Sequence, residues 1–243
     1  MDRFVLRLDK ISKNFGGLQV LLDVDLSVAK EEIVGLIGPN GAGKSTLFNV
    51  ITSIYKPDLG EVYLQGQKIT GLAPHKICHM GVARTFQLIK TFLKMTVLEN
   101  VMVGSVYGQR HPGKGARERA LEALELVELS EKKDIMAAHI TLSDRRLLEV
   151  AMALASMPVI TLLDEPMAGL NSFEIQKILQ VIKRAREERK ICVLWIEHKV
   201  DAVLDFCDRV AVLDYGLKIA DGKPDEIANN PKMIEAYLGE SPA

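Results

Sequence analysis

Apolar residues recur with a period of two near the start of the chain. Phe4, Leu6 and Leu8 lie two residues apart, and the apolar residues at even positions from 22 to 28 alternate with polar ones. This period is typical of strands with one buried face, as in antiparallel sheets. Further on, Gln65-Gly66-Gln67 separates two short strand patterns and predicts a hairpin. The sequence therefore predicts an antiparallel β-subdomain.

Three other runs are almost entirely apolar: residues 33–37, 159–163 and 191–196. Such runs are typical of parallel strands that are buried on both faces. Helical periodicity fills most of the chain from 88 to 157 and returns at Ile175, Ile178, Leu179 and Ile182. We therefore expect an α/β fold in one domain of residues 1–243. Its nucleotide-binding core, with a mainly parallel sheet, would comprise residues 1–87 and 158–243, and a helical subdomain would be inserted at 88–157.

The first apolar run leads directly into a glycine-rich loop, and a helix-compatible segment follows. The loop has the spacing G-x-x-x-x-G-K-[ST], and its residues are Gly38, Pro39, Asn40, Gly41, Ala42, Gly43, Lys44, Ser45 and Thr46. Glycines let successive N–H groups turn inward around a phosphate, and the helix adds its positive end. Lys44 would reach the β- and γ-phosphates, and the Ser45 hydroxyl would ligate Mg²⁺. An ordinary glycine turn is the alternative, but the flanking strand and helix favour a nucleoside triphosphate site.

Polar residues follow the other predicted strands at their carboxyl ends. Asp164 and Glu165 follow the run 159–163, and His198 lies just beyond 191–196. Residues 81–87 are expected to form a strand that ends in Gln87. Ligands of open α/β sheets bind beyond the carboxyl ends of the strands, so these side chains are candidates for the phosphate site. Phe15, ahead of the loop, is a candidate platform for a purine ring, although an aromatic residue at a strand end usually belongs to the core.

Composition and charge limit the classes of partner. The net charge is −1, so no basic field points to nucleic acid. No apolar run reaches the 18 or so residues that a membrane span needs. The N-terminus lacks the apolar core of a signal peptide, which favours a cytoplasmic protein. Any membrane role would come through a partner.

The order of these motifs resembles the ATP-binding subunit of ABC transporters over the whole chain. Several segments are similar to one branch, the importers of branched-chain (hydrophobic) amino acids. These segments are Lys13-Asn14-Phe15-Gly16-Gly17, Arg84-Thr85-Phe86-Gln87, Met95-Thr96-Val97-Leu98-Glu99-Asn100-Val101, Glu165-Pro166-Met167-Ala168-Gly169-Leu170-Asn171 and Ile234-Glu235-Ala236-Tyr237-Leu238-Gly239-Glu240.

The resemblance implies a role for each candidate residue. Phe15 would stack on adenine, and Ser45, Gln87 and Asp164 would hold Mg²⁺ directly or through water. Glu165 would act as general base on the attacking water, and His198 would contact the γ-phosphate together with Lys44. The resemblance also implies a second ATPase subunit, identical or different, and transmembrane permease subunits. These would hold the chain on the inner face of the membrane, and a periplasmic or extracellular binding protein would act indirectly.

One stretch departs from the family pattern. The signature is normally Leu-Ser-Gly-Gly-Gln or Leu-Ser-x-Gly-Asp, whereas this chain has Leu142-Ser143-Asp144. Two residues, one of them the motif glycine, are missing between Ser143 and Asp144. A degenerate site and a sequence short by two residues both account for this spacing. In the family, Ser143 and its neighbours would complete the partner's ATP site.

The expected function is ATP hydrolysis that powers import of branched-chain or related hydrophobic amino acids. Two alternatives stay open at this point. One is a regulatory ATP-binding module with a degenerate signature, and the other is the ATPase of another ABC transporter, such as a lipid exporter.

Overall fold

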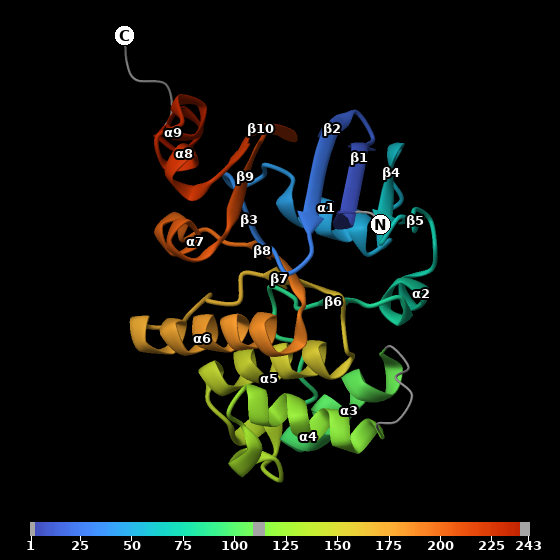
Figure 1. The fold of residues 1–243 in the computed structure, drawn as a ribbon, viewed down its shortest axis with the longest axis vertical. Helices are drawn as coiled ribbons and strands as arrows, with labels where there is room; N and C mark the ends of the chain where they lie inside the picture. The colour runs from blue at the N-terminus through green and yellow to red at the C-terminus, as the bar shows by residue number, and fades with distance from the viewer. Residues whose placement is uncertain (1–2, 109–114, 239–243) are drawn as a thin grey trace. The chain divides into compact units, whose positions relative to one another are not determined.

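A computed structural model of the chain describes residues 3–108 and 115–238. The chain divides into two compact units, Met1–Pro74 with Cys192–Ala243, and His75–Ile191. Figure 1 labels the helices and strands of both units. Within the described residues, no helix has the length and apolar character to cross a membrane.

The first unit contains the predicted antiparallel sheet. Its strands are β1 (Phe4–Phe15), β2 (Leu18–Ala29), β4 (Leu59–Leu64) and β5 (Gln67–Lys68), in the order β2-β1-β4-β5. Leu6, Leu8, Val24, Leu26 and Val28 are all buried, as the period of two predicts. The hairpin predicted around Gln65-Gly66-Gln67 joins β4 to β5.

Parallel strands form the other part of this unit. Strand β3 (Ile33–Ile37) lies between β8 (Cys192–Ile196) and β9 (Arg209–Asp214) and is parallel to both. Strand β10 (Leu217–Gly222) returns antiparallel on β9. All residues of β3 and β8 are buried, which explains their unbroken apolar character. Helices α1 (Lys44–Ile51), α7 (Val200–Phe206), α8 (Pro224–Ala228) and α9 (Pro231–Leu238) complete the unit.

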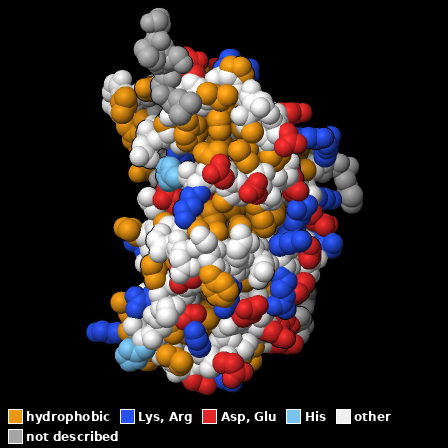
Figure 2. Space-filling view, turned by 90° about the vertical axis from the view of Figure 1, so that its left-hand side faces the viewer, with side chains coloured by type: hydrophobic (Ala, Val, Ile, Leu, Met, Phe, Trp, Pro, Cys, Tyr) orange, Lys and Arg blue, Asp and Glu red, His pale blue; other side chains and the backbone are white. Residues whose placement is uncertain are grey.

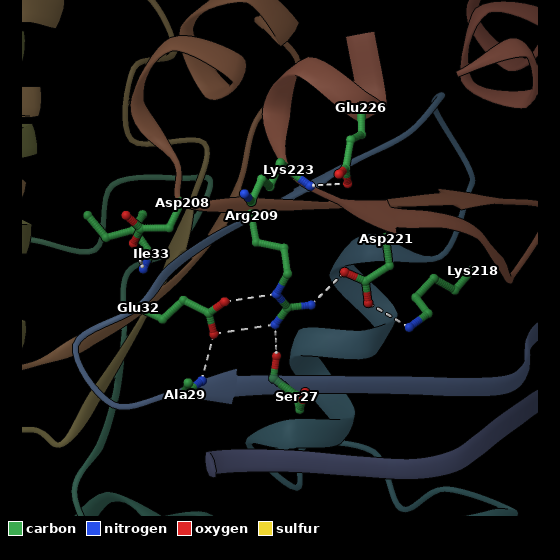
Figure 3. A network of polar contacts seen from close by, with 10 residues as sticks. All are labelled: Ser27, Ala29, Glu32, Ile33, Asp208, Arg209, Lys218, Asp221, Lys223 and Glu226. Atoms are coloured by element: carbon green, nitrogen blue, oxygen red, sulfur yellow. Dashed lines mark hydrogen bonds and ion pairs between the residues drawn. The ribbon is translucent and has the colours of Figure 1, made fainter. Parts of the chain in front are cut away.

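A polar network around Arg209 ties the two sheets of this unit together (Figure 3). The guanidinium donates to Glu32 Oε1 at 2.8 Å and to Asp221 Oδ1 at 2.5 Å, and it also donates to the carbonyl of Ser27 at the end of β2. The other oxygen of Glu32 accepts from the Ala29 N–H at 2.6 Å. The network thereby fixes the turn from β2 into β3, the strand that carries the glycine-rich loop.

The second unit contains a pair of parallel strands and the helices that were predicted after residue 88. The strands are β6 (Val82–Arg84) and β7 (Ile160–Asp164). Helices α3 (Val97–Tyr107), α4 (Ala116–Leu126) and α5 (Leu142–Ala155) pack against one another (Figure 1). The remaining elements are α2 (Pro74–His79), the short helices η1 (Ser130–Lys132) and η2 (Ala137–His139), and α6 (Ser172–Arg189).

Two predictions of local structure need correction. The strand predicted for residues 81–87 ends at Arg84, so Gln87 lies in the segment that follows it. The first helix after residue 88 begins only at Val97. Thr96 and Glu99 form a capping box at its start. The division of the chain at residues 87 and 157 into core and helical subdomain stays a prediction. Gly239 and Glu240 of the tail motif lie outside the described residues.

On the face drawn in Figure 2, side chains of both charges are interspersed. This distribution accords with the net charge of −1.

Candidate functional site

The glycine-rich loop connects β3 to α1, as predicted. Gly38 has φ 149°, and a Cβ on it would lie 2.0 Å from the carbonyl oxygen of Leu213. Gly43, the residue before α1, has φ 101°, and a Cβ there would lie 2.7 Å from the carbonyl oxygen of Val20. These two positions therefore require glycine for both backbone conformation and space.

Lys44 places its ammonium group within the curl of this loop. The side chain is buried, and Nζ donates to the carbonyl oxygens of Gly38 at 2.6 Å and Pro39 at 2.8 Å. The first turn of α1 is Lys44-Ser45-Thr46-Leu47, which adds a cation and two hydroxyl groups to the positive end of the helix dipole. This arrangement suits a bound polyphosphate.

Phe15 lies at the end of β1 with 42% of its surface exposed. Its ring packs edge-on against Tyr55, with 5.1 Å between the ring centroids. Lys13 Nζ lies 5.4 Å from the Phe15 ring centroid and is held by Asp58 at 2.9 Å. The ring is thus supported by its neighbours yet open to solvent, as a stacking platform requires.

His198 lies at the same edge of the parallel strands as the loop. Leu36 of β3 pairs with Ile196 of β8, so Gly38 and His198 each come two residues beyond paired positions. Neighbouring strands are about 4.8 Å apart, which places the two chain segments side by side at this edge. His198 is exposed, and its backbone N–H donates to the Glu197 carboxylate at 3.1 Å.

Gln87 and Glu165 meet in the second unit. The Gln87 side-chain amide donates to both carboxylate oxygens of Glu165, at 3.2 Å each. The strand register explains this contact, because Arg84 of β6 pairs with Leu162 of β7. Gln87 and Glu165 each lie three residues beyond these paired positions. Glu165 has φ 50°, a conformation that is uncommon outside glycine and recurs at functional sites.

Asp164 is buried beside Glu165 and has one orphaned oxygen. Its Oδ2 accepts from Arg84 Nη2 at 2.8 Å, and its backbone N–H donates to Thr85 Oγ1 at 3.1 Å. Oδ1 is buried and has no hydrogen-bond partner among residues 3–108 and 115–238. A buried carboxylate oxygen of this kind fits a magnesium ion or a water bound to one, because Mg²⁺ prefers oxygen ligands and keeps several waters.

The segment around Gln87 is held by charged side chains of α5 that the sequence analysis missed. Arg146 donates to the carbonyl oxygens of Phe86 at 3.4 Å and Gln87 at 3.1 Å. Glu149 lies 3.4 Å from Arg146 and accepts from the Lys90 N–H at 2.7 Å. Burial raises the pKa of Glu149 to about 6, although the Lys90 N–H and the Arg146 guanidinium oppose the rise. Both side chains are buried, at 7% and 6% exposure.

The shortened signature stretch forms the start of α5. Thr141 and Asp144 cap the helix reciprocally, and Ser143 is buried in its first turn. Lys132 Nζ donates to Asp144 Oδ2 at 2.6 Å. Burial opposes ionisation of Asp144, but the hydrogen bonds from Lys132 and Thr141 outweigh it and hold the pKa of this carboxyl below its ordinary value. A carboxylate thus lies in the first turn of α5, at the positive end of the helix dipole.

The predicted site residues fall into two groups, each placed within its own unit. Phe15, residues 38–46 and His198 belong to the first unit, and Gln87, Ser143, Asp164 and Glu165 belong to the second.

Comparison with known proteins identifies the family. The family model described as "ABC transporter" matches residues 21–168, and the one described as "Branched-chain amino acid ATP-binding cassette transporter" matches residues 218–243. The chain is 38% identical to the high-affinity branched-chain amino acid transport ATP-binding protein BraF of Pseudomonas aeruginosa over 255 residues, covering 99% of this chain and 100% of the relative. Its identity and coverage are the same for the high-affinity branched-chain amino acid transport ATP-binding protein LivG of Escherichia coli.

Solved structures agree with this assignment. A nucleotide-free ATP-binding cassette from an ABC transporter matches with a TM-score of 0.89 at 35% identity, over 98% of this chain and 100% of that one. The ADP conformation of an ATP-binding cassette matches with the same TM-score and coverage at 34% identity. With its intact phosphate loop, this chain belongs to the ABC transporter family, in the branch of the branched-chain amino acid transport ATP-binding proteins.

Proposed function

We propose that this chain is the ATP-hydrolysing subunit of an importer for branched-chain or related hydrophobic amino acids. The observation that carries the proposal is the Glu165 carboxylate held by the Gln87 amide at 3.2 Å, directly after the buried Asp164. Together with the intact loop around Lys44, this contact supports a phosphate site and a positioned base in the same chain. The substrate class rests on the names of the relatives and on the tail segment that matches their family.

Each residue has a proposed part in the reaction. Phe15 stacks on the adenine ring, and the loop amides and Lys44 bind the phosphates. Glu165 accepts a proton from the attacking water, and His198 donates a hydrogen bond to the γ-phosphate.

Ser45, Gln87 and Asp164 are the residues that would hold Mg²⁺, which supplies charge neutralisation for the phosphate oxygens when bound. The orphaned Asp164 Oδ1 supports this assignment.

The proposed partners are a second ATPase subunit and transmembrane permease subunits on the inner face of the membrane. A binding protein would deliver the amino acid to the permease from outside. A related cassette, 29% identical to this chain, has been solved as a dimer in a post-hydrolysis state with ADP and Pi. That precedent supports a dimer of two ATPase subunits.

Reconstitution tests the proposal. The purified chain, its partner ATPase and the permease are placed in proteoliposomes, and ATPase activity is measured with binding proteins loaded with leucine, isoleucine or valine. We expect severalfold stimulation by the loaded binding protein. Stimulation by none of the hydrophobic amino acids would contradict the proposed substrate class.

The shortened signature supports a second candidate, a regulatory ATP-binding module. Asp144 places a carboxylate at the start of α5, where it would repel the partner's γ-phosphate. Losing two or three hydrogen bonds to a charged group costs roughly 1.5–3 kcal/mol each.

Inserting Ala-Gly between Ser143 and Asp144 should therefore raise turnover at the partner's site, whereas an Ala-Ala insertion should not. If both insertions leave turnover unchanged, the short signature has no catalytic consequence.

A further inference from the structure

The tail helix α9 contacts the glycine-rich loop through one phenol. The Gly38 N–H donates to Tyr237 Oη at 2.7 Å, across 199 residues of sequence. On the other side of the same residue, the Gly38 carbonyl accepts from Lys44 Nζ at 2.6 Å. Gly38 therefore links the tail helix to the lysine that is proposed to bind the phosphates.

Helix α9 is fixed well enough to present this phenol. Asn230 caps its start, with Oδ1 accepting from the Lys232 N–H at 3.0 Å, and Pro231 follows as the first helical residue. Met233 is buried, and α9 packs against α8 and β10 (Figure 1). At about 1.5 Å per residue, Tyr237 lies about 9 Å along the helix from Pro231. The cap and the buried methionine thus hold the helix from which Tyr237 reaches the loop.

A pocket of 770 Å³ lies between the loop and the tail helix. Its lining includes Asn40 and Ala42 of the loop, Tyr215 of the β9–β10 hairpin, and Lys232, Glu235 and Ala236 of α9. Residues of the helix and of the loop therefore line the same space. The hydrogen bond from Gly38 to Tyr237 bridges the two elements beside that space.

We propose that Tyr237 is a positioning residue that holds the entry of the glycine-rich loop in the conformation that binds nucleotide. The proposal rests on the function proposed above, that this loop binds ATP. A loop held before binding loses less conformational freedom when the phosphates arrive, so affinity rises. By reciprocity, nucleotide on the loop stabilises the docked tail helix to the same degree. Through Tyr237, the tail helix thereby stabilises the loop that binds nucleotide.

The test is the affinity of the full chain for ADP, measured by calorimetry with Mg²⁺ present. Tyr237→Phe removes the hydroxyl and keeps the ring, and we expect it to weaken ADP binding about fivefold, which corresponds to about 1 kcal/mol. Tyr215→Phe is the matched control, because Tyr215 lines the same pocket with 88% of its surface exposed. It should leave ADP affinity unchanged.

A second measurement separates positioning from mere stability. In the wild-type chain, ADP should slow amide hydrogen exchange in residues 231–238, and in Tyr237→Phe this protection should be lost. A role confined to stability would lower the melting temperature of the nucleotide-free chain and leave ADP affinity unchanged, which would overturn the inference. Equal or tighter ADP binding by Tyr237→Phe, or no ADP-dependent protection, would also overturn it. These failures leave ADP binding by the wild-type chain intact, so they are distinct from failure of the proposed function.

Discussion

Replacing Arg146 with methionine should destabilise the protein more strongly at high pH than at low pH. Methionine has a similar length and no donors, so the substitution removes the hydrogen bonds to the carbonyls of Phe86 and Gln87. It also removes the cation 3.4 Å from the Glu149 carboxylate. Both charged side chains are buried, so water cannot replace the lost hydrogen bonds and ion pair.

The size of the effect follows from the state of Glu149. Breaking a buried pair by removing one partner costs about 3–5 kcal/mol, because a buried charge is left uncompensated. Protonation of Glu149 removes that charge, and its pKa is already raised to about 6 by burial. Without Arg146 this pKa rises further. The native state of the variant then holds a proton that the unfolded chain releases near its ordinary pKa of 4.5, so stability falls as pH rises through the folded-state pKa.

Urea unfolding at pH 5 and pH 8 measures this directly. We expect Arg146→Met to lose about 1–2 kcal/mol at pH 5, the value of two hydrogen bonds to neutral carbonyls, and about 3–5 kcal/mol at pH 8. The control is Arg146→Met combined with Glu149→Leu, which removes both charges and should show little dependence on pH. An equal loss at both pH values, or a double variant as unstable as the single one at pH 8, would show that the charge of Glu149 does not set the cost of losing Arg146.

Two further substitutions test other parts of the account. Phe15→Ala should weaken ATP binding about tenfold, because stacking a base on an aromatic ring is worth about 1–3 kcal/mol. Phe15→Tyr should retain the affinity for ATP. Equal affinities of the two variants would contradict the stacking role. Arg209→Met should lower the free energy of unfolding by about 3 kcal/mol, because Glu32 and Asp221 lose their shared cation. An unchanged urea midpoint would contradict this role for the network of Figure 3.

Local signals in the sequence predicted much of the fold. The apolar run before Gly38 and the run before Asp164 form β3 and β7. Strands that are buried on both faces have a nearly continuous apolar sequence, which makes them easy to recognise. The start of the tail helix, Pro231–Leu238, also has a local signal in the sequence, because Asn230-Pro231 is a strong start signal.

Contacts between distant residues could not be predicted in the same way. Arg146 and Glu149 look like residues of a solvated helix face, since charged side chains are seldom buried unless paired. Their partners, Gln87 and Lys90, are 59 residues away, and no local pattern encodes that pairing. The strand before Gln87 was predicted too long for a related reason. Thr85 still bonds to Leu162, but the regular strand ends at Arg84, whose side chain turns to the Asp164 carboxylate.

We propose that the site of this chain hydrolyses ATP, with Glu165 as the base. The most direct test is steady-state ATP turnover by the assembled complex carrying Glu165→Gln in this chain. Glu187→Gln, on the exposed face of α6, serves as the matched control. We expect a fall of about 100-fold or more for Glu165→Gln with ATP binding retained, the usual contribution of a positioned general base. Turnover equal to that of the control would contradict it.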